Sequence, residues 1–332
     1  MDVKYLFSFN IIFKKLKKEN PNIILDILFE KYLEKHRFFH TIKHIEDIFN
    51  LIQNEKNLTR DEKEILEIVA VFHDISYDPK CINNEENSIN IFKKVCPVSN
   101  GYSDIIKEII LSTKTGESLS NLGKIFNMFD RNILTKNFEE LLLYEKQIMK
   151  EYQYLDYSIY KQRRLEFLNA PLIYNSNLEQ LINYIKCYKL KIGIYAGSFN
   201  PFHLGHYDIL QKAEKIFDKV IIAKGINPEK ENDDYKIDLP FHQIETFTGL
   251  LTEYAKSKSN VADYYIIKGL RNGYDLDYEF NQLRWMENLT KENINIVYIP
   301  CSNKYGHISS SGIRGLKKLN TNVSEFIFKW SN

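Results

Sequence analysis

The sequence lacks the features that mark membrane, secreted and nucleic-acid-binding proteins. No apolar run reaches the roughly 18 residues that a membrane-spanning helix needs. The four cysteines stand far apart without a C-x-x-C pair, so neither a disulfide framework nor a zinc clip is expected. Lysine plus arginine (45) balance aspartate plus glutamate (44), and no overall field would attract nucleic acid or an anionic membrane. We therefore expect a cytoplasmic protein with neither kind of partner.

The N-terminal stretch MDVKYLFSFNIIFKKLKKENPN has an apolar patch that precedes its lysines, and no A-x-A-like cleavage site follows it. This order argues against a signal peptide and predicts an amphipathic helix. The 332 residues are enough for two domains, each with its own core.

The spacing of apolar residues changes near residue 188. Before it, segments such as EKEILEIVAVFHD and FEELLLYEKQIMKEY have apolar residues at helical intervals. After it, short apolar blocks (KIGIYAG, KVIIAKG, YYIIKGL, INIVYIP) alternate with helical stretches, which is typical of a parallel sheet covered by helices. The sequence therefore predicts an all-α domain over residues 1–186 and a Rossmann-like α/β domain with a parallel sheet over residues 187–332. A hinge is expected in NYIKCYKLK.

The stretch IYAGSFNPFHLGH places two histidines where the first strand of the α/β domain meets its first helix. His203 and His206 then lie at a helix N-terminus, where unpaired amides and the helix dipole favour a phosphate. The Ser198 hydroxyl adds another donor. The alternative is that both histidines only cap the helix; the H-x-G-H spacing at this junction favours the phosphate site.

Four motifs in the same order resemble the H-x-G-H nucleotidyltransferases and, within them, the phosphopantetheine adenylyltransferases. The motifs are YAGSFNPFHLGH, NPEK, KGLRNGYDLDYEF and YGHISSSGIR, and the resemblance covers roughly residues 190–320. The first motif alone suits a nicotinamide-mononucleotide adenylyltransferase or a cytidylyltransferase equally well. The GLRNGYDLDYE block favours the pantetheine branch.

The resemblance implies transfer of an adenylyl group from Mg²⁺-bound ATP to 4′-phosphopantetheine, giving dephospho-coenzyme A and pyrophosphate in coenzyme A biosynthesis. His206 would lie nearest the reacting α-phosphorus, and Lys230 would reach both the transferred and the incoming phosphate. Arg271 would bind the β- and γ-phosphates, and Glu279 the ribose or adenine side. The remaining residues implied to contact ATP phosphates are Ser198, His203, Ser309, Ser310 and Ser311.

Adenylyl transfer to a phosphomonoester depends on alignment of the reacting groups more than on proton transfer. A phosphomonoester that attacks an α-phosphorus is already an anion, so the site needs no general base, only orientation and charge neutralisation. Lys268 departs from the family, whose bacterial members usually have arginine there; the charge is kept but the bidentate fork is lost. The region from Lys230 to Lys268, which helps form the pantetheine pocket in the family, also looks shorter. Another phosphorylated acceptor, such as nicotinamide mononucleotide, therefore stays open.

The N-terminal half has its own histidines. HRFFHTIKHIEDIF spaces His36, His40 and His44 four residues apart, which would place them on one face of a helix, and VAVFHDISYDP ends a later helix in His73–Asp74. Histidines from two helices together with aspartates suit a divalent hydrolytic metal. His36 is expected at the surface, without a role.

The N-terminal motifs resemble, in order, a small branch of the HD-domain metal-dependent phosphohydrolases. They are RFFHTIKH, FHDISYDP, NNEENS, FDRNIL, and YEKQIMKEY with QRRLEFL, over roughly residues 28–182. The resemblance implies a divalent transition metal (Mn, Fe, Co or Ni) and an unknown phosphate ester as substrate. His40 would act as the leaving-group acid, by analogy with the distantly related cyclic-nucleotide phosphodiesterases. The implied metal ligands are His44, His73, Asp74 and Asp130.

Three questions stay open at this level. Glu85 and Glu86 either support a second metal or form a solvated acidic turn. LSTKTGES lacks a histidine that this branch usually has, so either one metal binds or the hydrolase is weakened. The HD domain could also be a non-catalytic module that senses a nucleotide. Since each half has its own set of motifs, we expect a bifunctional enzyme. Whether it forms a homo-oligomer stays open.

Overall fold

A computed structural model describes residues 25–96, 100–170, 174–226, 235–258, 261–290 and 294–330. The predicted N-terminal amphipathic helix and the NPEK segment with Lys230 lie outside these residues. Contacts divide the chain into two compact units that interleave in sequence: Met1–Glu151 with Leu168–Asn183, and Tyr152–Phe167 with Tyr184–Asn332. Within the described residues, no helix is both long and apolar enough to span a bilayer.

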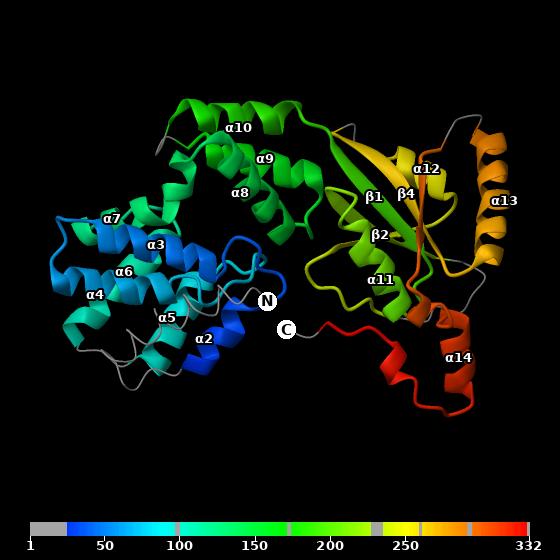
Figure 1. The fold of residues 1–332 in the computed structure, drawn as a ribbon, viewed down its shortest axis with the longest axis horizontal. Helices are drawn as coiled ribbons and strands as arrows, with labels where there is room; N and C mark the ends of the chain where they lie inside the picture. The colour runs from blue at the N-terminus through cyan, green and yellow to red at the C-terminus, as the bar shows by residue number, and fades with distance from the viewer. Residues whose placement is uncertain are drawn as a thin grey trace. The chain divides into compact units, whose positions relative to one another are not determined.

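The first unit is helical, as the apolar spacing predicts (Figure 1). Of the two helices that follow along the chain, α9 (Tyr157–Leu168) belongs to the second unit except for its last residue, and most of α10 (Ser176–Cys187) belongs to the first. The segment expected to be a hinge contains the last turn of α10. The other elements of the first unit are α2 (Leu25–Tyr32), α3 (Ile42–Asn54), α4 (Arg60–Phe72), α5 (Asn84–Val95), α6 (Asn100–Thr113), α7 (Asn121–Asp130), the short η1 (Arg131–Thr135) and α8 (Phe138–Glu151).

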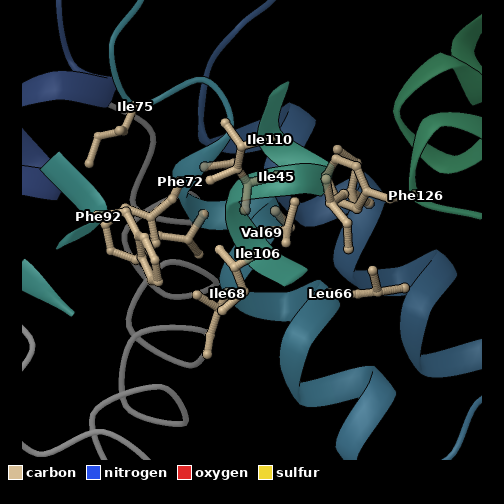
Figure 2. Close-up of a cluster of buried hydrophobic side chains, with 14 of the residues drawn as sticks. Ile45, Leu66, Ile68, Val69, Phe72, Ile75, Phe92, Ile106, Ile110 and Phe126 are labelled. Atoms are coloured by element: carbon tan, nitrogen blue, oxygen red, sulfur yellow. The ribbon is translucent and has the colours of Figure 1, made fainter. Parts of the chain in front are cut away.

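Helix α4 lies at the centre of this unit. Every residue from Ile65 to Phe72 is buried, so the last two turns of α4 are covered on all sides. Figure 2 shows Ile45, Ile106 and Phe126 from neighbouring helices around Val69 and Phe72. Truncating a buried phenylalanine such as Phe72 to alanine typically costs about 3–5 kcal/mol. The residues that directly follow α4, His73 and Asp74, are therefore held by a rigid support.

Helix α3 begins later than the histidine spacing predicts. Thr41 is its N-cap, with the side chain accepting a hydrogen bond from the Lys43 amide, so His36 and His40 precede the helix. The expectation that both share a helix face with His44 is therefore wrong. The guanidinium of Arg37 donates to the carbonyls of His40, Asp74 and Ile75, at 3.2, 2.7 and 3.0 Å, and these bonds hold the preceding segment as a turn. His36 is buried, not at the surface.

The second unit contains a five-stranded, fully parallel sheet in the order β3-β2-β1-β4-β5. The predicted strands are present, but β3 was not predicted, because its sequence QIETF has a single aliphatic residue and lies at a sheet edge. In Figure 1, α11 and α13 lie on opposite sides of the sheet. The strands are β1 (Leu190–Gly197), β2 (Lys219–Gly225), β3 (Gln243–Phe247), β4 (Ala262–Leu270) and β5 (Ile296–Pro300), and the helices are α11 (Leu204–Ala213), α12 (Leu251–Lys256), α13 (Gly273–Thr290) and α14 (Ser310–Lys318).

The strand order reverses direction between β1 and β4. The chain continues from β1 to β2 on one side, and from β4 to β5 on the other. In open parallel sheets, a crevice forms at the carboxyl ends of the strands at such a reversal, and ligands bind there. The H-x-G-H motif follows β1, and the KGLR motif ends β4, so the topology brings both to this edge.

Candidate functional site

A pocket of about 360 Å³ opens at the carboxyl ends of β1 and β4. Its walls come from the β1–α11 loop, the end of β4, the start of α13 and the start of α14. It is lined by every predicted residue of this half that the structure describes: Ser198, His203, His206, Lys268, Arg271, Glu279, Ser309, Ser310 and Ser311.

The two histidines cap α11 reciprocally. His203 Nδ1 accepts from the His206 amide at 3.4 Å, and His206 Nδ1 accepts from the His203 amide at 3.3 Å. The rings stack with centroids 3.6 Å apart. Since each Nδ1 is an acceptor, a neutral ring has its proton on Nε2. Each histidine is therefore fixed in one tautomer, with its Nε2–H group available as a donor in the pocket.

Burial keeps both imidazoles neutral. It lowers the pKa of His203 to about 4, helped by the positive charge of Arg271. It also lowers the pKa of His206 far below its ordinary value, with His203 and Arg271 contributing. At pH 7 both histidines are hydrogen-bond donors without charge, and neither can act as a general acid in its protonated form.

Two of the cations that line the pocket, Lys268 and Arg271, are each paired with a carboxylate on α13. Lys268 Nζ lies 3.0 Å from Glu279 Oε2. Arg271 donates to Asp275 from Nε and Nη2, at 2.9 Å each, and from its backbone amide. Sequence reasoning missed Asp275, which lies in the first turn of α13, four residues after Arg271. An anion that binds Lys268 competes with Glu279.

The three serines divide between capping and loop contacts. Ser309 Oγ accepts from the Gly312 amide at 3.1 Å and caps α14. Ser310 Oγ donates to the Pro201 carbonyl at 3.0 Å. Ser309 and Ser311 lie 3.4 Å apart, Oγ to Oγ. Hydroxyls at a helix N-terminus that lines the pocket are suited to an anion.

Comparison with known proteins identifies this half. Residues 194–316 match the cytidylyltransferase-like family. The phosphopantetheine adenylyltransferase of Caldanaerobacter subterraneus subsp. tengcongensis is 34% identical over 149 residues, which are 42% of this chain and 91% of that enzyme. The chain belongs to the adenylyltransferase family.

A second phosphopantetheine adenylyltransferase agrees with this assignment. The phosphopantetheine adenylyltransferase of Geotalea daltonii is 36% identical over 142 residues, 40% of this chain and 86% of that enzyme. Among solved structures, a putative nicotinate-nucleotide adenylyltransferase from Vibrio parahaemolyticus aligns at 20% identity and a TM-score of 0.29, covering 42% of this chain and 94% of that one. Since the family match covers residues 194–316, the similarity lies in the α/β half of the chain.

The helical unit contains a second cluster. One ligand atom from each of four side chains lies within 4.8 Å of the others: His44, His73, Asp74 and Asp130. His73 Nε2 lies 3.0 Å from Asp74 Oδ2, and His44 Nε2 lies 3.0 Å from Asp130 Oδ1. These are the four residues predicted as metal ligands, and they come from α3, the end of α4 and the end of α7.

The donor set of this cluster fits a divalent cation. His73 Nδ1 donates to the Ala70 carbonyl at 3.0 Å, which leaves Nε2 facing the carboxylates; Nε2 is buried and has no hydrogen-bond partner. A ring nitrogen between two carboxylates needs a cation there, either a proton or a metal ion. Burial disfavours the imidazolium, but Asp74 and Asp130 outweigh it and raise the pKa of His73. Two imidazoles and two carboxylates are typical ligands of hydrolytic transition metals.

Glu151, the last residue of α8, holds His40 beside this cluster. Its Oε1 accepts from the amides of Phe38, Phe39 and His40 at 2.7, 2.7 and 3.0 Å. Its Oε2 accepts from His40 Nδ1 at 2.6 Å and from the Tyr77 hydroxyl at 2.7 Å. Sequence reasoning assigned no role to Glu151, because 111 residues separate it from His40.

This network fixes the ring and the charge of His40. Burial opposes ionisation of Glu151, but His40 and the other donors outweigh it and lower the pKa of Glu151 to about 2. Burial likewise opposes protonation of His40, and Glu151 with Asp74 outweighs it and raises the pKa of His40. With Nδ1 bound to Glu151, His40 has Nε2 left for a ligand; the His40 and His44 rings lie 5.9 Å apart.

The acidic pair Glu85 and Glu86 meets a lysine. Lys114 Nζ lies 3.0 Å from Glu86 Oε1 and 3.6 Å from Glu85 Oε2. Lys114 therefore offsets one of the two negative charges of this pair.

Proposed function

We propose that the α/β domain, over residues 187–332, transfers an adenylyl group from ATP to 4′-phosphopantetheine and releases dephospho-coenzyme A and pyrophosphate. The observation that carries the proposal is the pocket at the β1–β4 reversal, where residues of three of the four motifs meet. The relatives support the acceptor, because this chain covers 91% of one phosphopantetheine adenylyltransferase and 86% of another.

In the proposed reaction, a phosphate oxygen of the acceptor attacks the α-phosphorus of ATP and the bond to the bridging oxygen of pyrophosphate breaks. The Nε2–H groups of His203 and His206 donate to the phosphate oxygens, whose charge spreads in the transition state. Arg271, held by Asp275, binds the outer phosphates. Mg²⁺ enters with ATP and neutralises part of the phosphate charge.

The identity of the acceptor is a separate part of the proposal. Lys268 leaves Glu279 to bind the incoming phosphate, with Lys230, which lies outside the described residues, as its expected partner. Nicotinamide mononucleotide is the alternative acceptor, because it also presents a phosphomonoester.

Pyrophosphate release tests both the adenylyl transfer and the identity of the acceptor. Protein and Mg-ATP are incubated with phosphopantetheine, nicotinamide mononucleotide, glycerol 3-phosphate or phosphocholine in turn, and the product is identified by mass. We expect release with phosphopantetheine alone, and a loss of about 10²–10³ in kcat for His206→Ala. His307→Ala is the matched control, since His307 is exposed and does not line the pocket. Release confined to nicotinamide mononucleotide overturns the acceptor; release with none overturns the transferase.

We also propose that the N-terminal region, over residues 1–186, is an HD-type phosphohydrolase. The four-ligand cluster favours this function, because its donors suit one divalent transition metal. Such a metal, when bound, supplies a Lewis acid and an activated water. His40 donates a proton from Nε2 to the leaving oxygen of a phosphate ester, while Glu151 holds its other nitrogen. The runner-up is a non-catalytic module that binds a nucleotide at the same cluster.

Metal analysis and hydrolysis of an aryl phosphate separate the two readings of this region. We expect purified protein to contain or bind Mn, Fe, Co or Ni, and His44→Ala to lose it. Asp47→Ala, an exposed residue on the same helix, should keep it. Metal binding without hydrolysis of any ester supports the sensing module, and full metal content in His44→Ala contradicts both.

A further inference from the structure

Three consecutive carbonyl groups before the histidine pair are bonded to the C-terminal part of the chain. The Asn200 carbonyl accepts from Arg314 Nη1, the Pro201 carbonyl from Ser310 Oγ, and the Phe202 carbonyl from the Phe328 amide. The Phe328 bond is 3.2 Å long. The loop that enters α11 is thus held from outside, by residues more than 100 positions further along the sequence.

This loop needs such anchoring. Phe199 has a φ of 47°, in the left-handed region that a bulky side chain seldom adopts and that costs about 1–3 kcal/mol. Its ring contacts those of Phe202 and His206, at centroid distances of 5.4 and 5.0 Å. A shift of the loop would therefore move the His206 ring directly.

The segment Val323–Trp330, which we name the C-terminal strap, holds the loop. Ile327 forms an isolated antiparallel bridge with His203 itself. The Phe328 ring is buried, stacks on Tyr207 at 3.9 Å and meets Phe202 edge-on at 6.0 Å. The Phe202 ring lies 5.4 Å from that of His206.

The far end of the strap has its own attachment. The Trp330 amide donates to Asp238 Oδ2 at 2.9 Å, and the Trp330 ring lies about 6 Å from the rings of Phe241 and His242. The strap thus joins the histidine loop to the chain just before β3. Phe328 lies between the two attachments and does not line the pocket.

We propose that Phe328 is a positioning residue for the histidine pair, acting through Phe202 and Tyr207. The proposal rests on the proposed adenylyl transfer, in which alignment is most of the catalysis. A displacement of about 1 Å in such a site can reduce the rate about 10²-fold. The strap thereby sets where the two Nε2 donors meet the phosphates without touching the substrate.

Three variants test this role. Phe328→Ala removes the ring, Phe328→Leu keeps an apolar side chain and the amide, and Lys329→Ala changes the exposed neighbour. We expect Phe328→Ala to lower kcat about 10–100-fold with KM for ATP changed less than threefold, Phe328→Leu to lower kcat by an intermediate amount, and Lys329→Ala to match wild type. Circular dichroism melts identify a variant that does not fold. If Phe328→Ala does not fold, the proposal requires that Phe328→Leu and Lys329→Ala still differ in kcat.

Two outcomes overturn the proposal: a kcat for folded Phe328→Ala within twofold of wild type, or equal losses in Phe328→Leu and Lys329→Ala. The ¹⁵N spectra of His203 and His206 provide a readout without turnover, because a displaced loop breaks the reciprocal Nδ1 caps and changes the tautomer signals. If wild type transfers no adenylyl group, the adenylyl-transfer proposal fails. Unchanged imidazole spectra in Phe328→Ala then refute the positioning role separately.

Discussion

Glu151→Gln should destabilise the helical unit by an amount that follows from its contacts. The carboxylate is fully buried and accepts from three amides, an imidazole and a phenol. Its pKa falls from an ordinary 4.5 to about 2, which corresponds to about 3 kcal/mol of folding free energy. An amide of the same shape keeps the three amide bonds but presents a donor to the His40 and Tyr77 side. The expected loss at pH 6 is therefore about 3 kcal/mol.

The pH dependence of this loss distinguishes the charge from simple packing. A carboxyl with a lowered folded pKa stabilises fully above its unfolded value and stops doing so as pH falls through its folded value. The difference between wild type and Glu151→Gln should thus shrink from pH 6 towards pH 3. At pH 6 the raised pKa of His40 also keeps the imidazole charged, so the ion pair is complete.

Urea unfolding followed by far-ultraviolet circular dichroism measures this loss. Both tryptophans, Trp285 and Trp330, belong to the α/β unit, so their fluorescence reports that unit separately. Glu139→Gln, an exposed glutamate on the same helix, is the control and should change stability by less than about 0.5 kcal/mol. A loss below about 1 kcal/mol for Glu151→Gln at pH 6, or one of equal size at pH 3, would refute the reasoning.

Three further predictions concern the sites themselves. Asp74→Ala should lose the bound metal and hydrolysis of an aryl phosphate yet keep adenylyl transfer; a folded variant that stops transferring would mean that the two units are coupled. Conversely, His206→Ala should keep full metal content by elemental analysis while transfer falls about 10²-fold or more. The ¹⁵N signals of His203 and His206 should show no protonation from pH 8 to pH 5.5, because burial holds both pKa values low; a midpoint near 6.5 would contradict the neutral-donor assignment.

The parts of each site that lie close in sequence could be predicted. His203 and His206 belong to one loop, and His73 and Asp74 are adjacent, so residue type and spacing were enough to select them as candidate site residues. The parallel sheet that supports His203 and His206 followed from four apolar blocks in the sequence. The edge strand β3 gave no such signal, because an edge position needs few apolar residues.

The supporting residues could not be predicted, because their partners are remote. Glu151 meets His40 across 111 positions, and Phe328 meets Phe202 across more than 100. Neither has a local pattern that distinguishes it from a surface glutamate or a core phenylalanine. The start of α3 was also misjudged, since a four-residue histidine spacing does not exclude an N-cap between His40 and His44, and Thr41 is one.

Both sites contain histidine, but the groups around the imidazoles have opposite charge, so the two sites suit different ligands. In the α/β unit, each imidazole has its Nδ1 on a backbone amide and an arginine nearby, so it stays neutral and donates. In the helical unit, carboxylates surround the imidazoles, so a cation is required among them. Phosphoryl groups suit the first arrangement, and a metal ion the second. Since each set is complete within one compact unit, one chain can offer an anion site with neutral imidazoles and a separate cation site.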